Sequence, residues 1–558
     1  MKVVSIFLSI YFFSALYGYG QNKEVSKAIP HLEQQGAAMR LVVKGKPFLL
    51  ISGELHNSTS GGFEYMRQAW KKLAAKNLNS VIATTSWELV EPEEGQFDFA
   101  LVDSVIKGAR EANLKLVLIW FASWKNGGSV YIPSWIKKNY DKYPRAKDEQ
   151  GKPLEILTAL CDASAAADAK AYAALMRHIR EVDGKDQTVV MMQVENEMGM
   201  LDNAGTTTGN ARRDFSEVAN AAYDGTVPKD LIDYLVKHKE NLFPELYKVW
   251  AANGFKTSGS WEQVFGKSEF KPDKKDWKFY SYYTEELFSA WNYAKYTEKV
   301  AVAGKKEYAI PMYVNAWQKQ PFSFSPGKYP SGGPLPQVLD IWRAAAPSID
   351  FLAPDIYMDE FTWACEEYTR SGNPLFIPEA RGGEYGAASS FYAFGEFGAG
   401  CFSPFGIDND IDKKDPLDES YAVLKNMSSI ILANQGKGTM KGIFVDSSSQ
   451  VQQFEFGDYT IEAKLGSGKT IAGGIIIQTG PNEFIVAGRA LDIFFTPKNT
   501  STRIGVDKTD EGIFENTKWV PKRRLNGDEV HASTWDGTGP KLPGNKVSIQ
   551  KISLYSYK

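Results

Sequence analysis

The chain has 558 residues, a net charge of −3 and 43% hydrophobic residues, so it is long enough for two or three domains with large cores. It carries neither a basic tail nor an acidic block, which argues against nucleic acid as a partner. The five histidines show no metal-ligand spacing, so we predict neither a metal nor a cofactor. Three widely spaced cysteines exclude a disulfide framework but leave one pair open: Cys161, Cys365 and Cys401.

Residues 1–20 have the pattern of a cleavable signal peptide. Lys2 supplies the positive charge, residues 3–17 form a short apolar run, and Gly18 and Gly20 precede polar residues. The run is short for a transmembrane span, although an N-terminal anchor helix is the alternative. The lack of a nearby cysteine argues against a lipoprotein anchor. We therefore expect a secreted or periplasmic protein without a membrane span.

The region 21–410 alternates apolar strands with amphipathic helices. Helical patterns include 64–76, 99–112 and 166–182. Eight strands separated by helices are typical of a (β/α)8 TIM barrel, which we predict as the catalytic domain. The eight expected strands are 48–52, 80–84, 114–120, 188–194, 309–314, 351–357, 374–379 and 398–402.

A second, all-β domain is expected after the barrel. Residues 411–437 read as a connecting helix, centred on 417–435. From 438 to 558 the chain has short alternating runs bounded by Gly, Pro, Asn and Asp, which indicate an antiparallel β-sandwich. No low-complexity linker separates the two parts, so we expect them to pack together. Glycan binding and subunit contact are open roles for the β-domain, with structural support as the default.

The run 188–194 is apolar and suits a strand buried on both faces, and it breaks abruptly into Glu195, Asn196 and Glu197. Catalytic residues of TIM barrels lie at the carboxyl ends of the strands. Taken alone, such a run is more often an ordinary strand whose end is charged. Strand alternation would place Glu195 inside the barrel, one pleat deeper than Glu197, in a supporting role.

A second carboxylate, Glu379, follows the seventh predicted strand. Two carboxylates on separate barrel strands suit glycoside hydrolysis, which needs neither a metal nor a cofactor. We predict Glu197 as the general acid/base and Glu379 as the nucleophile. We also expect the Asn196 amide to bind the sugar 2-hydroxyl, an interaction that strengthens in the transition state.

The string Gln193-Val-Glu-Asn-Glu-Met-Gly199 resembles the QVENEYG motif of the β-galactosidases of glycoside hydrolase family 35. Ile51-Ser-Gly53 with His56 resembles that family's first strand, and the string Trp87 to Gly95 resembles a second-strand motif shared by families 35 and 42. The resemblance implies a barrel with the acid/base on strand 4 and the nucleophile on strand 7. It also implies a bacterial branch that acts on plant galactosides such as xyloglucan side chains.

The chain departs from this resemblance where the family holds its sugar. Ser123 stands where a galactose-binding carboxylate is expected, and Thr84 stands where a sugar-contacting Tyr is common. Met198 replaces a Tyr of the motif. These departures leave the catalytic pair intact but open the identity of the sugar.

Further substrate contacts are expected from residues that follow the strands. His56 would hydrogen-bond the substrate, with a core residue as the alternative, and Glu88 would bind a hydroxyl or pair with an arginine. Trp124 and Trp317 would stack on the sugar, with packing as the alternative. Tyr357 would hydrogen-bond the nucleophile, unless it is only an aromatic residue at the barrel rim. The full predicted substrate-binding set is Asn196, His56, Trp87, Glu88, Ser123, Trp124, Trp317 and Tyr357.

Together these features predict a retaining exo-β-galactosidase whose partner is a carbohydrate, with a homo-oligomer left open. Two alternatives remain: a retaining glycosidase for another sugar such as a β-L-arabinopyranoside, and an inert carbohydrate-binding protein on the same fold.

Overall fold

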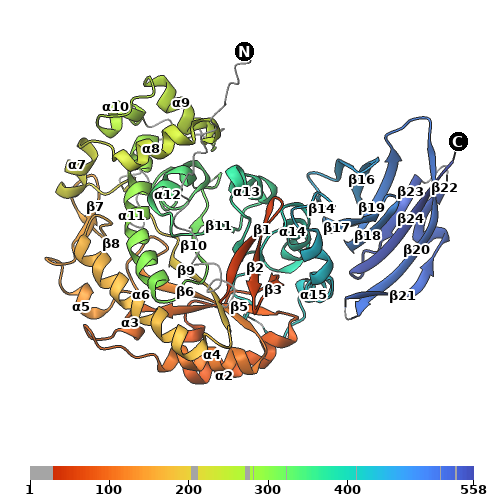
Figure 1. Cartoon of the computed structure of the whole chain (residues 1–558), viewed down its shortest axis with the longest axis horizontal. Helices are drawn as coiled ribbons and strands as arrows, with labels where there is room; N and C mark the ends of the chain where they lie inside the picture. The colour runs from red at the N-terminus through yellow and green to blue at the C-terminus, as the bar shows by residue number, and fades with distance from the viewer. Residues whose placement is uncertain are drawn as a thin grey trace, which may run out of the picture.

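The computed structural model describes residues 29–202, 211–269, 277–278, 280, 282–321, 323, 325–409, 411–515, 517–533 and 537–557 (Figure 1). The predicted signal peptide, 1–20, lies outside this part of the chain. Among the described residues, no helix combines the length and the apolar character needed to cross a membrane. The three cysteines are free thiols, so no pair forms among them.

Eight parallel strands form one sheet in the order β4-β13-β12-β11-β10-β9-β6-β5. Beyond the end of β4, the Ile82 N–H donates to the Gly53 carbonyl and the Leu55 N–H to the Ile82 carbonyl, both at 3.0 Å, which joins β4 to β5 and closes the barrel. The predicted TIM barrel is therefore confirmed. Its strands are β4 Leu50–Ile51, β5 Ser80–Ser86, β6 Lys115–Lys125, β9 Val189–Asn196, β10 Met312–Trp317, β11 Phe351–Ile356, β12 Ile377–Ala380 and β13 Cys401–Pro404.

The strands are apolar on both faces because the barrel is filled inside and covered by helices outside. One buried cluster fills the interior and includes Leu50, Ile82, Ile119 and Tyr313. The residues that alternate with them pack against the helices in a larger cluster. The helices of this ring are α2 Phe63–Ala75, α3 Trp87–Val90, α4 Ala100–Glu111, α5 Ser134–Lys137, α6 Asp162–Asp183, α12 Leu339–Ala345, α13 Phe361–Tyr368, α14 Gly383–Glu396 and α15 Pro416–Asn434.

The segment between β9 and β10 contains several helices. Ser260 and Gln263 form a capping box that starts α10, and α11 packs along α6. The helices are α7 Glu217–Asp224, α8 Lys229–Lys237, α9 Pro244–Ala252, α10 Trp261–Phe265 and α11 Tyr283–Glu307. Short 3-10 turns lie at η1 Thr59–Gly61, η2 Lys239–Asn241, η3 Pro336–Val338, η4 Arg370–Gly372 and η5 Gly527–Glu529, and one hairpin pairs β7 Arg145–Lys147 with β8 Pro153–Leu157.

A three-stranded antiparallel sheet precedes the barrel and was not expected from the sequence. It comprises β1 His31–Gln35, β2 Ala38–Val43 and β3 Lys46–Phe48. Leu41 and Val43 of β2 join the cluster that fills the barrel interior. This sheet therefore closes the amino-terminal end of the barrel, the end opposite the catalytic face.

The C-terminal strands form two antiparallel sheets, shown in blue in Figure 1, with a hydrophobic core of their own. The six-stranded sheet has the order β14-β17-β18-β24-β20-β21 and the five-stranded sheet the order β15-β16-β19-β23-β22. The predicted sandwich is thus present. Its strands are β14 Met440–Asp446, β15 Val451–Phe456, β16 Tyr459–Leu465, β17 Ile471–Gly480, β18 Glu483–Arg489, β19 Leu491–Pro497, β20 Arg503–Glu515, β21 Lys518–Leu525, β22 Val530–Ser533, β23 Gly537–Leu542 and β24 Ser548–Tyr557.

The two domains share one core at α14. This helix packs on β14 and β17, and Ile475 and Ile477 of β17 belong to the barrel's outer cluster. α15, expected as a connector, packs against α14, β3 and β4 and so belongs to the helical ring of the barrel.

Candidate active site

Glu197 follows β9 directly, where the backbone leaves the regular strand conformation. Glu195 and Glu197 both have left-handed backbone angles, with φ values of 62° and 43°. Non-glycine residues seldom adopt this conformation, and such strain concentrates at functional sites. The Glu197 N–H donates to Asn315 Oδ1 at 3.0 Å, which ties the end of β9 to β10.

Glu379 lies on β12, beside an irregularity of the ladder. β12 has one residue more than β13 between its two paired positions, and such a bulge changes the direction of a side chain. The Glu379 carboxylate accepts a hydrogen bond from the Tyr357 hydroxyl at 2.9 Å and a longer one from Asn196 Nδ2 at 3.4 Å. These two donors hold the carboxylate in one orientation, which is what a nucleophile requires.

A third carboxylate, Asp355 of β11, completes the cluster and was not singled out from the sequence. One carboxylate oxygen each of Glu197, Asp355 and Glu379 lies within 4.8 Å of the other two. Asp355 Oδ2 accepts a hydrogen bond from Asn315 Nδ2 at 2.8 Å, so Asn315 links Asp355 to the backbone of Glu197. The sequence did carry one signal for this residue: Asp355 is the charged residue of an otherwise apolar strand.

Burial dominates the electrostatics of the cluster. Burial and the charge of Glu379 together raise the pKa of Glu197 to about 8, against the opposing charge of the Lys125 ammonium group. Burial and the charge of Glu379 also hold the pKa of Asp355 well above its usual range. Glu197 is therefore protonated at neutral pH, as a general acid must be.

The same three carboxylates are close enough to share a cation. Their surroundings favour protons instead, because hydrogen-bond donors already contact Glu379 and Asp355. The raised pKa of Glu197 shows that one proton can occupy the cluster near neutral pH. The donor set thus fits acid/base and nucleophilic chemistry better than ion binding.

The predicted position of Glu195 inside the barrel is wrong. Its carboxyl interacts with Asp168 of helix α6 and accepts a hydrogen bond from the Trp124 N–H at 2.8 Å. The left-handed φ of Glu195 breaks the alternation and turns the side chain toward the helices. Its expected supporting role agrees with these contacts.

Ser123 and Trp124 are likewise misassigned as substrate contacts. The Ser123 hydroxyl donates to Asp168 Oδ2 at 2.6 Å and is fully buried. Trp124 is also fully buried and meets Tyr293 and Tyr296 of α11 edge to face. Both side chains pack between the barrel wall and the helices, so they hold β6 against α6 and α11.

The second predicted strand shows a similar difference. Trp87 is fully buried and donates to Glu91 Oε2 at 2.8 Å, so it is a packing residue rather than a sugar contact. Glu88 pairs with Lys137 at 3.1 Å rather than with an arginine. Its carboxylate stays partly exposed.

Three predicted contacts do lie at the mouth of the barrel. Tyr357 is 37% exposed while bonded to Glu379. His56 is partly buried, with its Nε2 2.7 Å from Asn409 Nδ2 and its ring against Phe405. Trp317 ends β10, is half-buried and pairs in register with Asp355. Whether these side chains bind sugar stays a prediction.

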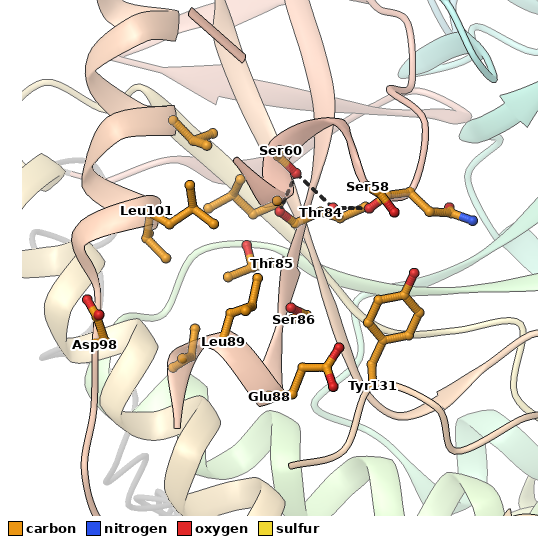
Figure 2. Close-up of a pocket in the computed structure, with 16 residues that line it drawn as sticks. Ser58, Ser60, Thr84, Thr85, Ser86, Glu88, Leu89, Asp98, Leu101 and Tyr131 are labelled. Atoms are coloured by element: carbon orange, nitrogen blue, oxygen red, sulfur yellow. Dashed lines mark hydrogen bonds between the residues drawn. The ribbon is translucent and has the colours of Figure 1, made fainter. Parts of the chain in front are cut away.

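A pocket of about 240 Å³ lies beside the mouth, between the loop containing η1 and helices α3 and α4. Figure 2 shows Glu88 and Tyr131 on one side of it and Leu101 on the other. The Ser60 hydroxyl and the Thr84 backbone and hydroxyl oxygens hydrogen-bond at its upper wall. Glu197, Asp355 and Glu379 do not line it.

Comparisons with known proteins agree with this geometry over part of the chain. Residues 57–247 match the family model described as beta-galactosidase, that of glycoside hydrolase family 42. The expected family 35 is thus not confirmed, and family 42 is the one whose model matches. Residues 417–535 match a domain of unknown function, DUF5597.

Two curated relatives match shorter segments. A β-galactosidase of Xanthomonas manihotis is 30% identical over 167 residues, which cover 29% of this chain and 25% of that protein. A β-galactosidase of Canis lupus familiaris is 32% identical over 104 residues, or 17% of this chain and 15% of that one. The chain thus spans a quarter or less of these relatives.

Solved structures with a similar barrel include the catalytic domain of a Paenibacillus polymyxa β-amylase, 17% identical with a TM-score of 0.46, covering 67% of this chain and 96% of that one. A β-galactosidase from the psychrophilic Marinomonas ef1 is 11% identical with a TM-score of 0.44, covering 69% and 60%. These values carry no information on activity. It is the match of residues 57–247, which include Glu197 and Asn196, that identifies this part of the barrel as similar to β-galactosidase-type glycoside hydrolases.

Proposed function

We propose that the protein is a retaining exo-β-galactosidase. The observation that carries the proposal is the carboxylate pair Glu197 and Glu379, whose nearest oxygens lie within 4.8 Å at the carboxyl ends of β9 and β12. Retaining glycosidases hold their two carboxyl groups about 5–5.5 Å apart, whereas inverting enzymes need about 6.5–9.5 Å for a water molecule. The short separation supports double displacement.

In the first step, Glu379 attacks the anomeric carbon while Glu197 gives its proton to the leaving oxygen. The Glu379 charge raises the pKa of Glu197, so formation of the glycosyl–enzyme ester removes one cause of that shift. The pKa of Glu197 therefore falls in the intermediate. Glu197 then serves as the base that activates water for the second step.

Two further features support the finer parts of the proposal. Glu197 and Glu379 are only 4% and 5% exposed, which favours a pocket that admits a chain end over an open groove. The matched β-galactosidase family favours terminal β-galactosyl residues as the substrate. Plant-type galactosides and export to the periplasm or medium belong to the same proposal and rest on the sequence patterns.

The mechanism is tested by replacing each carboxylate and adding azide. Glu379→Ala should lower kcat by about 10⁴-fold or more, and azide should restore turnover and give the α-galactosyl azide. Glu197→Ala should instead give the β-galactosyl azide, because azide then attacks the intermediate on Glu379. The products are identified by NMR on an activated aryl β-galactoside.

Full activity of Glu379→Ala, or the same azide anomer from both variants, would contradict the assignment. A wild-type protein that binds galactose without hydrolysing any aryl β-galactoside would support the inert binding protein instead. A panel of aryl glycosides, including the arabinopyranoside, decides the sugar.

A further inference from the structure

Glu54 lies inside the barrel at the level of the nucleophile. Leu50 of β4 belongs to the interior cluster, and alternation places Ser52 and Glu54 on the same side as Leu50. The Glu54 N–H donates to the Pro404 carbonyl at 2.9 Å, and Pro404 pairs in register with Ala380, the residue after Glu379. Glu54 is thus two strands away from Glu379.

The Glu54 carboxyl is buried without a partner. The side chain is 1% exposed, and neither of its oxygens has a hydrogen-bond partner in the described part of the chain. An unpaired buried polar group costs free energy, so each one in a folded protein calls for an explanation. One explanation is that a bound ligand supplies the missing hydrogen-bond partners of the Glu54 carboxyl.

The charges around Glu54 are those of the catalytic site. Burial and the charges of Glu379 and Glu197 hold its pKa well above the usual range, while the charge of Lys125 acts in the opposite direction. The raised pKa favours the protonated carboxyl, which both donates and accepts and so can bond two neighbouring hydroxyls of one sugar ring.

We infer that Glu54 is a specificity-determining residue that binds hydroxyls of the sugar in the catalytic pocket. The inference rests on the proposed function for the identity of that sugar. Around the closed barrel, β4 lies three strands from β9, the strand that precedes Glu197, and two strands from β12, which carries Glu379. Since Glu197 meets the scissile oxygen, we place Glu54 at the hydroxyls away from the scissile bond, at ring positions 3, 4 or 6.

A cycle of enzyme and substrate changes tests this contact. Wild type, Glu54→Gln and Glu54→Ala are compared on aryl β-galactoside and on its 3-deoxy, 4-deoxy and 6-deoxy forms. Loss of a buried hydroxyl contact should lower kcat/KM of Glu54→Ala on the galactoside by about 100-fold or more. On the deoxy sugar that lacks the bonded hydroxyl, the same substitution should have little further effect. Glu54→Gln should lose less, because an amide also donates and accepts.

Ser52→Ala is the matched control: Ser52 lies one pleat deeper in the same extended segment, and its hydroxyl also has no hydrogen-bond partner among the described residues. It should change kcat/KM equally for all four sugars. An equal loss across the sugars for the Glu54 variants would overturn the inference in favour of a structural role. A loss explained wholly by a shifted pH profile would overturn it in favour of a purely electrostatic role.

A failure of the proposed hydrolysis is distinguished by calorimetry. If wild type turns over no glycoside, binding of galactose and of the deoxygalactoses is compared between wild type and Glu54→Gln. If Glu54→Gln loses affinity for galactose but not for one deoxygalactose, the sugar contact of Glu54 stands even though the proposed reaction fails. Equal affinities of the two proteins would reject the contact. If Glu54→Ala does not fold, the Gln variant carries both tests.

Discussion

The pKa of Glu197 depends on burial and on two charged neighbours that act in opposite directions. Burial and Glu379 raise its pKa to about 8, whereas Lys125 lowers it. Lys125 ends β6 and pairs in register with Asn196, so its position follows from the closed barrel. It was not singled out from the sequence because a lysine at a strand end is normally a solvated residue.

The pH dependence of kcat/KM tests this balance, since it reports the free enzyme. The general acid is lost as pH rises through the pKa of Glu197, so we expect the alkaline limb near pH 8. Lys125→Met removes the charge that favours the carboxylate form and should move the limb to higher pH. Lys137→Met is the control, because Lys137 pairs with Glu88, which lies outside the carboxylate cluster. This variant should leave the alkaline limb of the pH profile in place. A limb that moves to lower pH in Lys125→Met would contradict the argument.

At the scale of elements, β9 is held to the helices by a buried acid pair. Glu195 and Asp168 lie between the strand and α6, and Trp120 and Ser123 donate to Asp168 at 2.8 Å and 2.6 Å. Burial raises the pKa of both acids, and the hydrogen bond between them favours one shared proton, held on Glu195. This contact fixes the kink that delivers Glu197.

Glu195→Gln should keep this contact, because an amide donates to Asp168 and accepts from the Trp124 N–H. Glu195→Ala leaves that N–H unpartnered and should lower the free energy of unfolding by about 2–3 kcal/mol. The folded-state pKa of Glu195 exceeds its unfolded value, so its contribution is full at low pH and is lost as pH rises. Denaturant unfolding should therefore show that the free energy of unfolding of Glu195→Gln rises relative to that of wild type at alkaline pH. A relative fall at alkaline pH would refute the shared proton.

At the scale of the whole molecule, the β-domain is joined to the barrel by close backbone contact at α14. A Cβ on Gly473 of β17 would lie 2.3 Å from the Ala388 carbonyl oxygen, and a Cβ on Gly395 would lie 2.8 Å from the Gly442 Cα. Glycine is needed at both places because the helix rests directly on the sheet. The β-domain therefore stabilises the helix that follows the nucleophile strand.

Gly473→Ala should consequently destabilise both domains together. Overpacking of this kind costs about 1–3 kcal/mol, which calorimetry would report as a lower Tm. Gly480→Ala at the other end of β17 is the control, because its nearest neighbour would be 3.5 Å away. A Gly473→Ala variant with an unchanged Tm would show that the interface is loose.

The sequence by itself determined the barrel and the β-domain, and it singled out Glu197 and Glu379 as the proposed catalytic pair. Period-2 and period-3.6 apolar patterns act locally, and the carboxyl ends of parallel strands meet on one face whatever the details. The tertiary structure decided which side chains turn inward. Alternation failed at Glu195, where the backbone is left-handed, and at Ser123, in the irregular end of β6, so both side chains turn to the helices. Only the closed barrel brings three further residues to the site, because they come from strands far apart in the chain: Asp355, Lys125 and Glu54.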